Sequence, residues 1–436
     1  METSPHSIVR DDSRCVGCIA CGKACPTRAI RVRDSLAVVN AALCIDCGEC
    51  IRACPHSAVT ARTSSPSDLK RFEYTVAIPS TALYSQFGRS VHPEQVAGAL
   101  LQVGFNAFYD VSWMCQMVGG AVDTYLSECG EPWPKISATC PAVIRLILQR
   151  YPDLIPHVVP IETPRELTAR VARRKMAAAT GLPPDRIGVF YITPCSAIMQ
   201  SIISPIGLLE SYFDGAFSVA ELYGPLLRAI KGGCPAVPED SFNLSGLQWG
   251  LTGGERAAMR NANSLAVSGV GEVVKVFDSI EAGKFQMLDF IEAHICPDGC
   301  VGGQLLVEGR HSARHALQAV VAHVTQRSAQ GPAPSVQEER VRAMFRQHFF
   351  DMEDQIRARP LMREPPDLQT AILVRRERTR LLSKLPHRDC GACGAPDCET
   401  LAGDVLAGEA DIDDCVFLKL QQLANPPGPP KENGDE

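Results

Sequence analysis

Two cysteine runs near the N-terminus have residue types and spacing that suit metal chemistry. The first is C-V-G-C-I-A-C-G-K-A-C-P from Cys15, and the second is C-I-D-C-G-E-C-I-R-A-C-P from Cys44. Each cysteine of the first run recurs at the same relative position in the second, which indicates an internal duplication. The spacing C-x2-C-x2-C-x3-C-P is typical of a pair of 4Fe-4S clusters, in which the fourth cysteine of each run ligates the other cluster. The predicted ligands are Cys15, Cys18, Cys21 and Cys54 for one cluster, and Cys44, Cys47, Cys50 and Cys25 for the other.

This duplicated segment is expected to carry electrons. Three closely spaced thiolates wrap three corners of a cubane, and the proline after the fourth cysteine turns the chain away. Zinc is the alternative metal, but zinc sites use paired C-x2-C knuckles and not triplets followed by Cys-Pro. Two cubanes in so short a segment must lie close together, which is the geometry of an electron-transfer path. The spacing is that of a bacterial two-cluster ferredoxin, which the segment resembles.

A third candidate site centres on the stretch C-P-D-G-C-V-G-G that begins at Cys296. A Pro-Asp-Gly turn returns the chain to Cys300, and two glycines follow where the backbone must pack close to something bulky. Two thiolates rarely complete a metal site, so partners are needed. Cys140 in T-C-P and Cys195 in T-P-C each begin an apolar segment, and the four cysteines together are predicted to hold one buried iron-sulfur cluster. The alternative is four separate buried cysteines, since free cysteine is among the most buried residue types.

The C-terminal cysteines form a fourth candidate site. Their spacing is C-x2-C-x4-C-x16-C, with a helical segment and a Gly-Glu-Ala turn before the last cysteine. This pattern resembles the small 4Fe-4S domain at the end of certain corrinoid and electron-transport proteins. Zinc is again the alternative metal. The predicted ligands are Cys390, Cys393, Cys398 and Cys415.

Composition limits what the chain can do. It has 436 residues, of which 45% are hydrophobic and 19 are cysteines, and its net charge is -6. We expect two or three domains and no electrostatic footprint for nucleic acid. Neither an apolar signal-peptide core nor a twin-arginine signal is found, so a reducing cytoplasm is expected. The longest uncharged run, 187–209, is interrupted by Pro194 and Pro205, which favours a buried strand, a turn and a buried helix over a membrane span.

Alternating strand and helix patterns are expected to position the central cysteines. Cys140, Cys195 and Cys296 fall where a strand or loop gives way to a turn, which is where α/β folds collect their ligands. The alternation predicts an α/β domain with a largely parallel sheet. Strands are expected at 74–79, 105–109, 186–192 and 285–291, and helices at 93–103, 141–150, 219–231, 312–326, 336–349 and 368–385.

The predicted fold class is a mixed α/β central domain with a small ferredoxin-like N-terminal domain and a small helical C-terminal iron-sulfur domain. The remaining cysteines, Cys115, Cys129 and Cys234, are expected to be buried small hydrophobic residues. The predicted boundaries are 1–62 for the two-cluster domain, 70–330 for the central domain, 331–378 for a helical connector, 379–424 for the C-terminal 4Fe-4S domain and 425–436 for a disordered Pro-rich tail.

The order of the central motifs resembles that of a known family. T-C-P at Cys140 is followed by T-P-C at Cys195, by G-L-T-G-G from Gly250 and by C-P-D-G-C-V-G-G. This order is similar to that of the FeFe hydrogenase large subunit, and S-G-V-G-E-V-V-K-V-F-D from Ser268 is similar to a segment of its sensor-like branch. The resemblance implies that the four central cysteines hold a 4Fe-4S cluster. It also implies that Cys300 bridges this cluster to a diiron unit carrying carbon monoxide and cyanide.

Several positions depart from the family pattern. Catalytic members have a proton-shuttling cysteine where this chain has Thr139, whose hydroxyl has no pKa near neutrality. They have a lysine that donates to a cyanide where this chain has Ile198, which offers neither charge nor donor. His294 replaces a usual methionine and is expected to donate to a cluster sulfide or a backbone carbonyl, the alternatives being a proton donor or a metal ligand. Glu255 stands where an apolar residue is usual, and the acidic proton relay has no clear counterpart at 118–123.

These features lead to three functional hypotheses. The first is a cytoplasmic protein with four 4Fe-4S clusters, slow or inactive as a hydrogenase, that reports redox state or H2 to a redox or signalling protein. The second is an active hydrogenase with a complete diiron cofactor. The third is an iron-sulfur cluster carrier or scaffold without the diiron unit. Thr139 and Ile198 separate the enzyme from the other two, and neither nucleic acid nor a membrane is expected as a partner.

Overall fold

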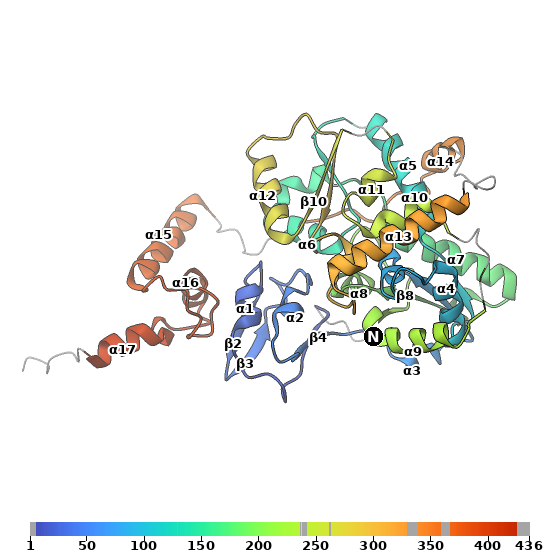
Figure 1. Ribbon diagram of the computed structural model, residues 1–436. Helices are drawn as coiled ribbons and strands as arrows, with labels where there is room; N and C mark the ends of the chain where they lie inside the picture. The colour runs from blue at the N-terminus through green and yellow to red at the C-terminus, as the bar shows by residue number, and fades with distance from the viewer. Residues whose placement is uncertain are drawn as a thin grey trace, which may run out of the picture. The chain divides into compact units, whose positions relative to one another are not determined.

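The chain divides into two compact units, whose elements are coloured along the sequence in Figure 1. The first unit comprises Met1–Val9, Ile45–Gly48 and Ala61–Pro360, and the second comprises Arg10–Cys44, Glu49–Thr60 and Leu361–Glu436. The computed structural model describes residues 6–128, 130–235, 237, 242–260, 263–328, 338–358 and 367–424.

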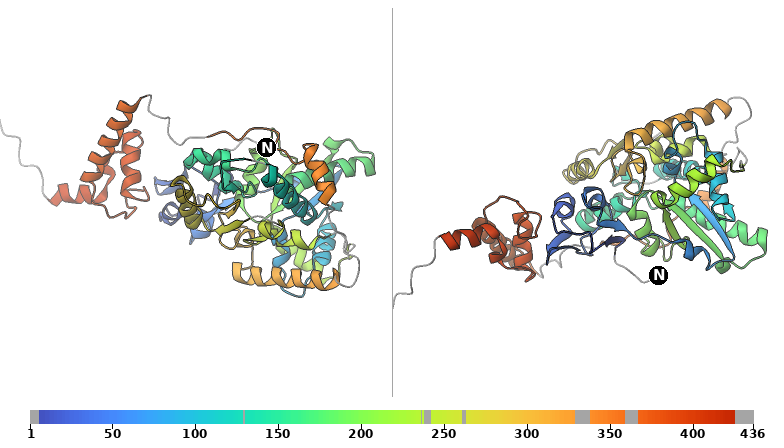
Figure 2. Two further views of the ribbon diagram at one scale, coloured as in Figure 1. Left: turned by 90° about the horizontal axis from the view of Figure 1, so that it is seen from above. Right: turned by 60° about the horizontal axis from the view of Figure 1, so that its bottom comes forward.

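A four-stranded parallel sheet lies at the centre of the first unit, and its strands run side by side in the right-hand view of Figure 2. Because successive side chains of a strand point to opposite faces, Val76 and Ile78 pack on one face and Ala77 packs on the other. Both faces are buried, which explains the nearly continuous apolar sequence of the two central strands. The strand order is β6 (Ala107–Phe108), β5 (Tyr74–Pro79), β8 (Ile187–Thr193) and β9 (Gly215–Ser218).

A second, three-stranded parallel sheet lies in the same unit. Its order is β10 (Ser264–Ser268), β11 (Phe290–His294) and β7 (Lys135–Ile136). Ile136 and Ile291 of this sheet share a hydrophobic core with Ile147 and Phe277, which lie on two flanking helices. The parallel sheet predicted from the sequence is therefore present as two separate sheets.

Helices cover both faces of the first sheet. The face that carries Val76 packs against α5 and α7, and the opposite face packs against α4 and α9. No helix among the described residues is long and apolar enough to cross a membrane. The helices of the first unit are α3 (Pro66–Leu69), α4 (Pro93–Gln102), α5 (Ser112–Glu128), α6 (Pro141–Arg150), α7 (Pro164–Thr180), α8 (Ser196–Ile203), α9 (Val219–Lys231), α10 (Leu244–Leu247), α11 (Gly254–Ala257), α12 (Val270–Glu281), α13 (Arg310–Ser328) and α14 (Glu338–Arg346).

The second unit joins an antiparallel hairpin to the C-terminal helices. Strands β2 (Ile30–Arg33) and β3 (Leu36–Val39) turn at Asp34 and Ser35, both of which have positive φ. The N–H of Val32 donates to the carbonyl of Gly394 at 2.8 Å, which links the hairpin to the C-terminal cysteine segment. The other elements are α1 (Ala20–Ala24), α2 (Glu49–Ala53), α15 (Leu368–Lys384), α16 (Cys398–Leu406) and α17 (Val416–Ala424), with short strands β1 (Ile8–Arg10) and β4 (Val59–Ala61) at the boundary between the units.

Most of the predicted elements are confirmed, with two corrections. The helices at 141–150 and 219–231 and the strand at 74–79 have the predicted limits. The strand predicted at 285–291 is wrong, because Phe285 has a φ of 66° in a turn and the strand is Phe290–His294. The strand predicted at 105–109 is limited to Ala107–Phe108.

The predicted domain boundaries stay predictions. The short segment Ile45–Gly48 belongs to the first unit, although the sequence predicts it within the N-terminal domain. Residues 331–337 and 359–366 of the predicted connector and the whole predicted tail 425–436 lie outside the described residues. Cys129 lies outside them as well.

Candidate metal centre

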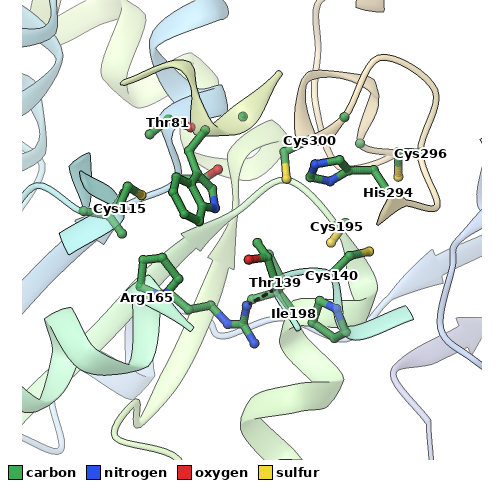
Figure 3. A pocket seen from close by; sticks show the side chains of 18 of the residues that line it. Thr81, Cys115, Thr139, Cys140, Arg165, Cys195, Ile198, His294, Cys296 and Cys300 are labelled. Carbon is green, nitrogen blue, oxygen red and sulfur yellow. Dashed lines mark hydrogen bonds between the residues drawn. The ribbon is translucent and has the colours of Figure 1, made fainter. Parts of the chain in front are cut away.

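Three strands deliver cysteines to one pocket at their carboxyl ends. Cys140 follows β7 and caps α6, Cys195 follows β8 and caps α8, and Cys296 follows β11. With Cys300, these residues line a single apolar pocket. Their side chains lie around one space beside His294 (Figure 3). The structure thus brings together the four cysteines that the sequence predicts as ligands of one cluster.

The turn between Cys296 and Cys300 depends on glycine. Gly299 has a φ of 87°, and a Cβ there would lie 2.8 Å from the carbonyl oxygen of Gly250. A Cβ on Gly303 would lie 2.3 Å from the carbonyl oxygen of Pro194, directly before Cys195. The predicted close approach is therefore to the backbone of two neighbouring loops, and it fixes the Cys296–Cys300 turn against the Cys195 loop.

Burial determines the chemistry of these thiols. It raises the pKa of Cys195 to about 12, and the nearby Cys300 and Cys140 raise that pKa further. A thiolate at this position therefore needs a positive partner, which the irons of a cluster provide. The donor set and the apolar lining fit a 4Fe-4S cluster. Among the described residues, no three His, Cys, Asp or Glu side chains converge as they would on a single metal ion.

His294 is fully buried and connects the cysteine turn to a carboxylate. Its Nε2 lies 2.9 Å from Oε1 of Glu292, and its side chain also hydrogen-bonds to Cys300. Burial lowers the pKa of His294, but the hydrogen bonds to Cys300 and Glu292 raise it more, so that its net pKa lies well above the ordinary value. His294 therefore lies beside the predicted ligands in a position to donate to Cys300.

A second buried carboxylate, that of Glu255, lies in contact with Thr139. Glu255 accepts a hydrogen bond from the hydroxyl of Ser137 at 2.6 Å and also bonds to the side chain of Thr139. Burial raises the pKa of Glu255 to about 7, and the neighbouring Glu292 raises it further. Thr139, which departs from the family pattern, thus contacts the carboxyl group of Glu255, which can exchange a proton near neutral pH.

Arg165 and Trp249 complete the wall of the pocket, together with Ile198 and Cys115. Cys115 is buried, as predicted, whereas Cys234 is only partly buried and its sulfur donates to the carbonyl of Gln95. The sequence analysis did not single out Arg165 or Trp249. The only sequence signal for Arg165 is its position directly after the Thr-Pro pair that begins α7.

The second unit gathers the first N-terminal set of ligands. Cys15, Cys18, Cys21 and Cys54 line one small pocket. Burial raises the pKa of Cys21 to about 11, and the charges of the other three add to that shift.

The second N-terminal set is divided between the units. Cys25 and Cys50 lie close enough to interact, because Cys25 adds to the pKa of Cys50, which burial raises to about 12. Cys44 belongs to the same unit, whereas Cys47 belongs to the first unit. The ligation of a cluster by these four residues stays a prediction.

The C-terminal cysteines gather around a small hydrophobic core. Cys398 and Cys415 are buried in it, and Cys393 packs against it. Burial raises the pKa of Cys393, with further contributions from Cys390 and Cys415. A hydrogen bond also fixes this segment, because the N–H of Cys398 donates to Asp389 at 2.8 Å. All four predicted ligands are thus positioned near one another.

Comparison with known families gives three matches. The family described as "Iron only hydrogenase large subunit, C-terminal domain" matches residues 73–201 and 248–304. The family described as "4Fe-4S dicluster domain" matches residues 7–55, and the family described as "Putative Fe-S cluster" matches residues 385–417. The matched regions contain all the cysteines discussed above as ligands.

Individual relatives are distant. The chain is 26% identical over 370 residues to the periplasmic [Fe] hydrogenase large subunit of Nitratidesulfovibrio vulgaris, covering 70% of this chain and 87% of that protein. It is 21% identical over 261 residues to the NADP-reducing hydrogenase subunit HndD of Solidesulfovibrio fructosivorans, covering 48% of this chain and 44% of HndD. Among solved structures, a variant of the [FeFe]-hydrogenase HydA1 from Chlamydomonas reinhardtii matches with a TM-score of 0.47 and 15% identity, covering 67% of this chain and 97% of that one.

Proposed function

Because the chain is a homologue of hydrogenase large subunits and its central domain belongs to the iron-only hydrogenase large-subunit family, we propose that it is an electron-transfer protein that senses redox state or H2. It is slow or inactive as a hydrogenase. In this proposal, Cys140, Cys195, Cys296 and Cys300 would hold a 4Fe-4S cluster in the central pocket, and Cys300 would also be the ligand shared with a diiron unit. The observation that carries this proposal is the convergence of four partly buried cysteines from three loops on one apolar pocket.

The residues that line the pocket have different proposed roles. A bound diiron unit supplies the site at which H2 binds and is split. His294 orients the sulfur of Cys300 by hydrogen bonding, and Glu292 fixes the imidazole. The apolar lining excludes water, which strengthens every electrostatic interaction inside the pocket.

Slow turnover follows from Thr139. Its hydroxyl cannot give up or take a proton near neutral pH, whereas a thiol can. With a threonine at this position, a proton produced at a bound diiron unit would lack a thiol to accept it. Oxidation of H2 would then reduce the clusters without sustaining fast turnover.

The electrons are proposed to reach a separate redox or signalling protein through the N-terminal and C-terminal clusters, four 4Fe-4S clusters in all. Cysteines committed to clusters instead of disulfides favour the cytoplasm. The second candidate is an active hydrogenase. It is supported by Glu255, whose carboxyl group can exchange a proton and hydrogen-bonds to Thr139. A cluster carrier is disfavoured, because the central cysteines are only partly exposed and line a pocket inside the central domain.

A comparison of cluster reduction with turnover tests this proposal. The anaerobic protein is reconstituted with iron, sulfide and a synthetic diiron unit, and its visible absorbance is followed under H2. We expect the clusters to be reduced within minutes while H2 evolution from a chemical reductant stays slow. Rapid evolution would support the active hydrogenase instead. Cluster transfer to an apo-ferredoxin, without any response to H2, would support the carrier.

A further inference from the structure

Arg165 is a buried cation in the wall of the central pocket. It lies in the first turn of α7, directly after Pro164, and is only 9% exposed. Figure 3 shows its guanidinium beside Thr139. A buried charge is costly unless an opposite charge or a full set of hydrogen bonds compensates it.

The acceptors around Arg165 are neutral. Nη1 donates to the carbonyl oxygen of Thr139 at 3.1 Å and Nη2 to the hydroxyl of Ser201 at 3.5 Å, whereas Nε is buried without an acceptor. In the described part of the chain, no carboxylate oxygen forms an ion pair with it within 4.0 Å. Glu162 and Glu166 lie near it, but burial raises the pKa of both, that of Glu166 to about 7. Among the described residues, the guanidinium thus has no carboxylate in direct ion-pair contact, and its hydrogen-bond acceptors are neutral oxygens.

The guanidinium contacts the same face of α8 on which Ile198 lies. Ser201 lies three residues after Ile198 on α8, and residues three apart share a helix face. The hydroxyl of Ser201 in turn donates to the carbonyl oxygen of Ile198 at 2.7 Å. A lysine at position 198 would thus project from the same face that Arg165 already contacts.

Trp249 gives an independent indication of the same ligand chemistry. The residue is 5% exposed and lines the pocket, and its indole Nε1–H is buried without an acceptor. An indole nitrogen can only donate. Two residues with buried N–H donors that lack acceptors, one of them a cation, therefore line a pocket whose surface is mostly apolar. A water molecule would satisfy the donors but would leave the charge uncompensated.

We infer that Arg165, assisted by Trp249, donates to an anionic cyanide ligand of the diiron unit, and so supplies from α7 the cationic donor that Ile198 does not supply from α8. This inference rests on the proposed function, because it needs a diiron unit at Cys300. Arg165 is a positioning residue here. It pairs the buried negative charge of the ligand and holds the unit in place.

The test compares infrared spectra and iron retention among variants of the full chain reconstituted with the synthetic diiron unit. Arg165→Gln keeps a polar side chain of similar reach but removes the charge. Arg174→Gln is the matched control, since Arg174 is an exposed arginine on the same helix. The double variant Arg165→Gln/Ile198→Lys returns a cation to the pocket from α8. The visible absorbance of the cubanes checks that each variant folds and holds its clusters.

We expect Arg165→Gln to shift the cyanide stretching bands and to weaken retention of the diiron unit by about tenfold to a hundredfold, as for a lost hydrogen bond to a charged group. The double variant is expected to recover most of this retention, and Arg174→Gln to match the wild type. Unchanged cyanide bands and retention in Arg165→Gln would overturn the inference and leave the proposed function standing. Absence of all such bands in the wild type would overturn both the inference and the proposed response to H2. The absorbance of the cubanes would then show whether the electron-transfer role survives.

Discussion

In the proposed function, Thr139 is the residue that is expected to slow turnover. Its hydroxyl hydrogen-bonds to Glu255. The carboxylate that could accept a proton is therefore present, but the thiol that would pass a proton to it is missing. Replacing Thr139 by Cys places a thiol in contact with that carboxylate. Because general acid-base groups contribute about 10²- to 10⁴-fold, Thr139→Cys should raise the rate of H2 evolution by at least about 10²-fold.

Thr139→Ser is the control for this prediction, since it keeps a hydroxyl and the hydrogen bond to Glu255. H2 evolution is measured by gas chromatography with the same diiron occupancy in each variant. Equal rates for the Cys and Ser variants would show that proton exchange at 139 is not what limits turnover.

Glu166 makes the stability of the first unit depend on pH. Burial raises its pKa to about 7 in the folded state, from an ordinary value of 4.5. Between these values the folded state holds a proton that the unfolded state releases, so stability falls as pH rises from about 4.5 to about 7. The slope from this one group is up to about 1.4 kcal/mol per pH unit.

Glu166→Gln should remove this part of the pH dependence. The midpoint of anaerobic thermal unfolding is measured between about pH 5 and about pH 8. The variant should show a flatter profile than the wild type, whereas Glu73→Gln, at an exposed ion pair, should not. Identical profiles for wild type and Glu166→Gln would mean that the carboxyl is ionised in the folded protein throughout this range.

At the scale of elements, the Cys296–Cys300 turn is held by glycine. Gly299→Ala would place a methyl group 2.8 Å from the carbonyl oxygen of Gly250, at a φ of 87° that side chains rarely adopt. The cost is about 1–3 kcal/mol, and the turn can relieve it only by moving Cys300. We expect loss of iron and sulfide from the central cluster alone.

Gly271→Ala is the matched control, because Gly271 lies in α12 with nothing within 4 Å of a built Cβ. Iron and acid-labile sulfide are counted in both variants, and electron paramagnetic resonance identifies which cluster is lost. A full complement of iron in Gly299→Ala would show that the turn tolerates the change.

A buried ion pair joins β2 to α16 in the second unit. Nε and Nη2 of Arg31 donate to the two carboxylate oxygens of Asp404 at 2.5 and 2.8 Å, and the side chain of Asp404 is only 6% exposed. Removing one partner leaves a buried charge, which costs about 3–5 kcal/mol. Asp404→Ala should therefore loosen the contact between the hairpin and the C-terminal module.

Hydrogen-deuterium exchange measures this contact directly. Exchange in α16 should accelerate in Asp404→Ala, whereas Asp12→Ala, which removes an exposed ion pair with Arg10, should leave it unchanged. Equal protection of α16 in both variants would mean that hydrophobic packing, and not the ion pair, holds the module.

How far the sequence predicts this structure depends on the kind of signal. Cysteine spacing and strand-helix alternation are local, so β5, α6, α9 and the grouping of ligands could be predicted. The Arg165 guanidinium meets Ser201 of another helix, and no local pattern reports such a contact. The same holds for Glu292, whose carboxylate accepts from the backbone of Gly253 and Arg256. Residues that meet only through the tertiary fold were therefore missed.

At the scale of the whole molecule, the predicted clusters are distributed over two units. The central site lies in the first unit, and the C-terminal and first N-terminal ligand sets lie in the second. Within the second unit, the guanidinium of Arg33 donates to the carbonyl of Cys393 at 3.3 Å, which ties the C-terminal cysteine segment to the N-terminal hairpin.

In the proposed function, the four central cysteines hold a complete cofactor that responds to H2 without fast turnover. An infrared spectrum of the anaerobically reconstituted protein tests this, with the synthetic diiron unit supplied and spectra recorded under argon and then under H2. We expect sharp carbon monoxide and cyanide bands that differ from those of the free unit, shift under H2, and are lost in Cys300→Ser. Bands identical to those of the free unit, or bands that H2 leaves unmoved, would contradict it.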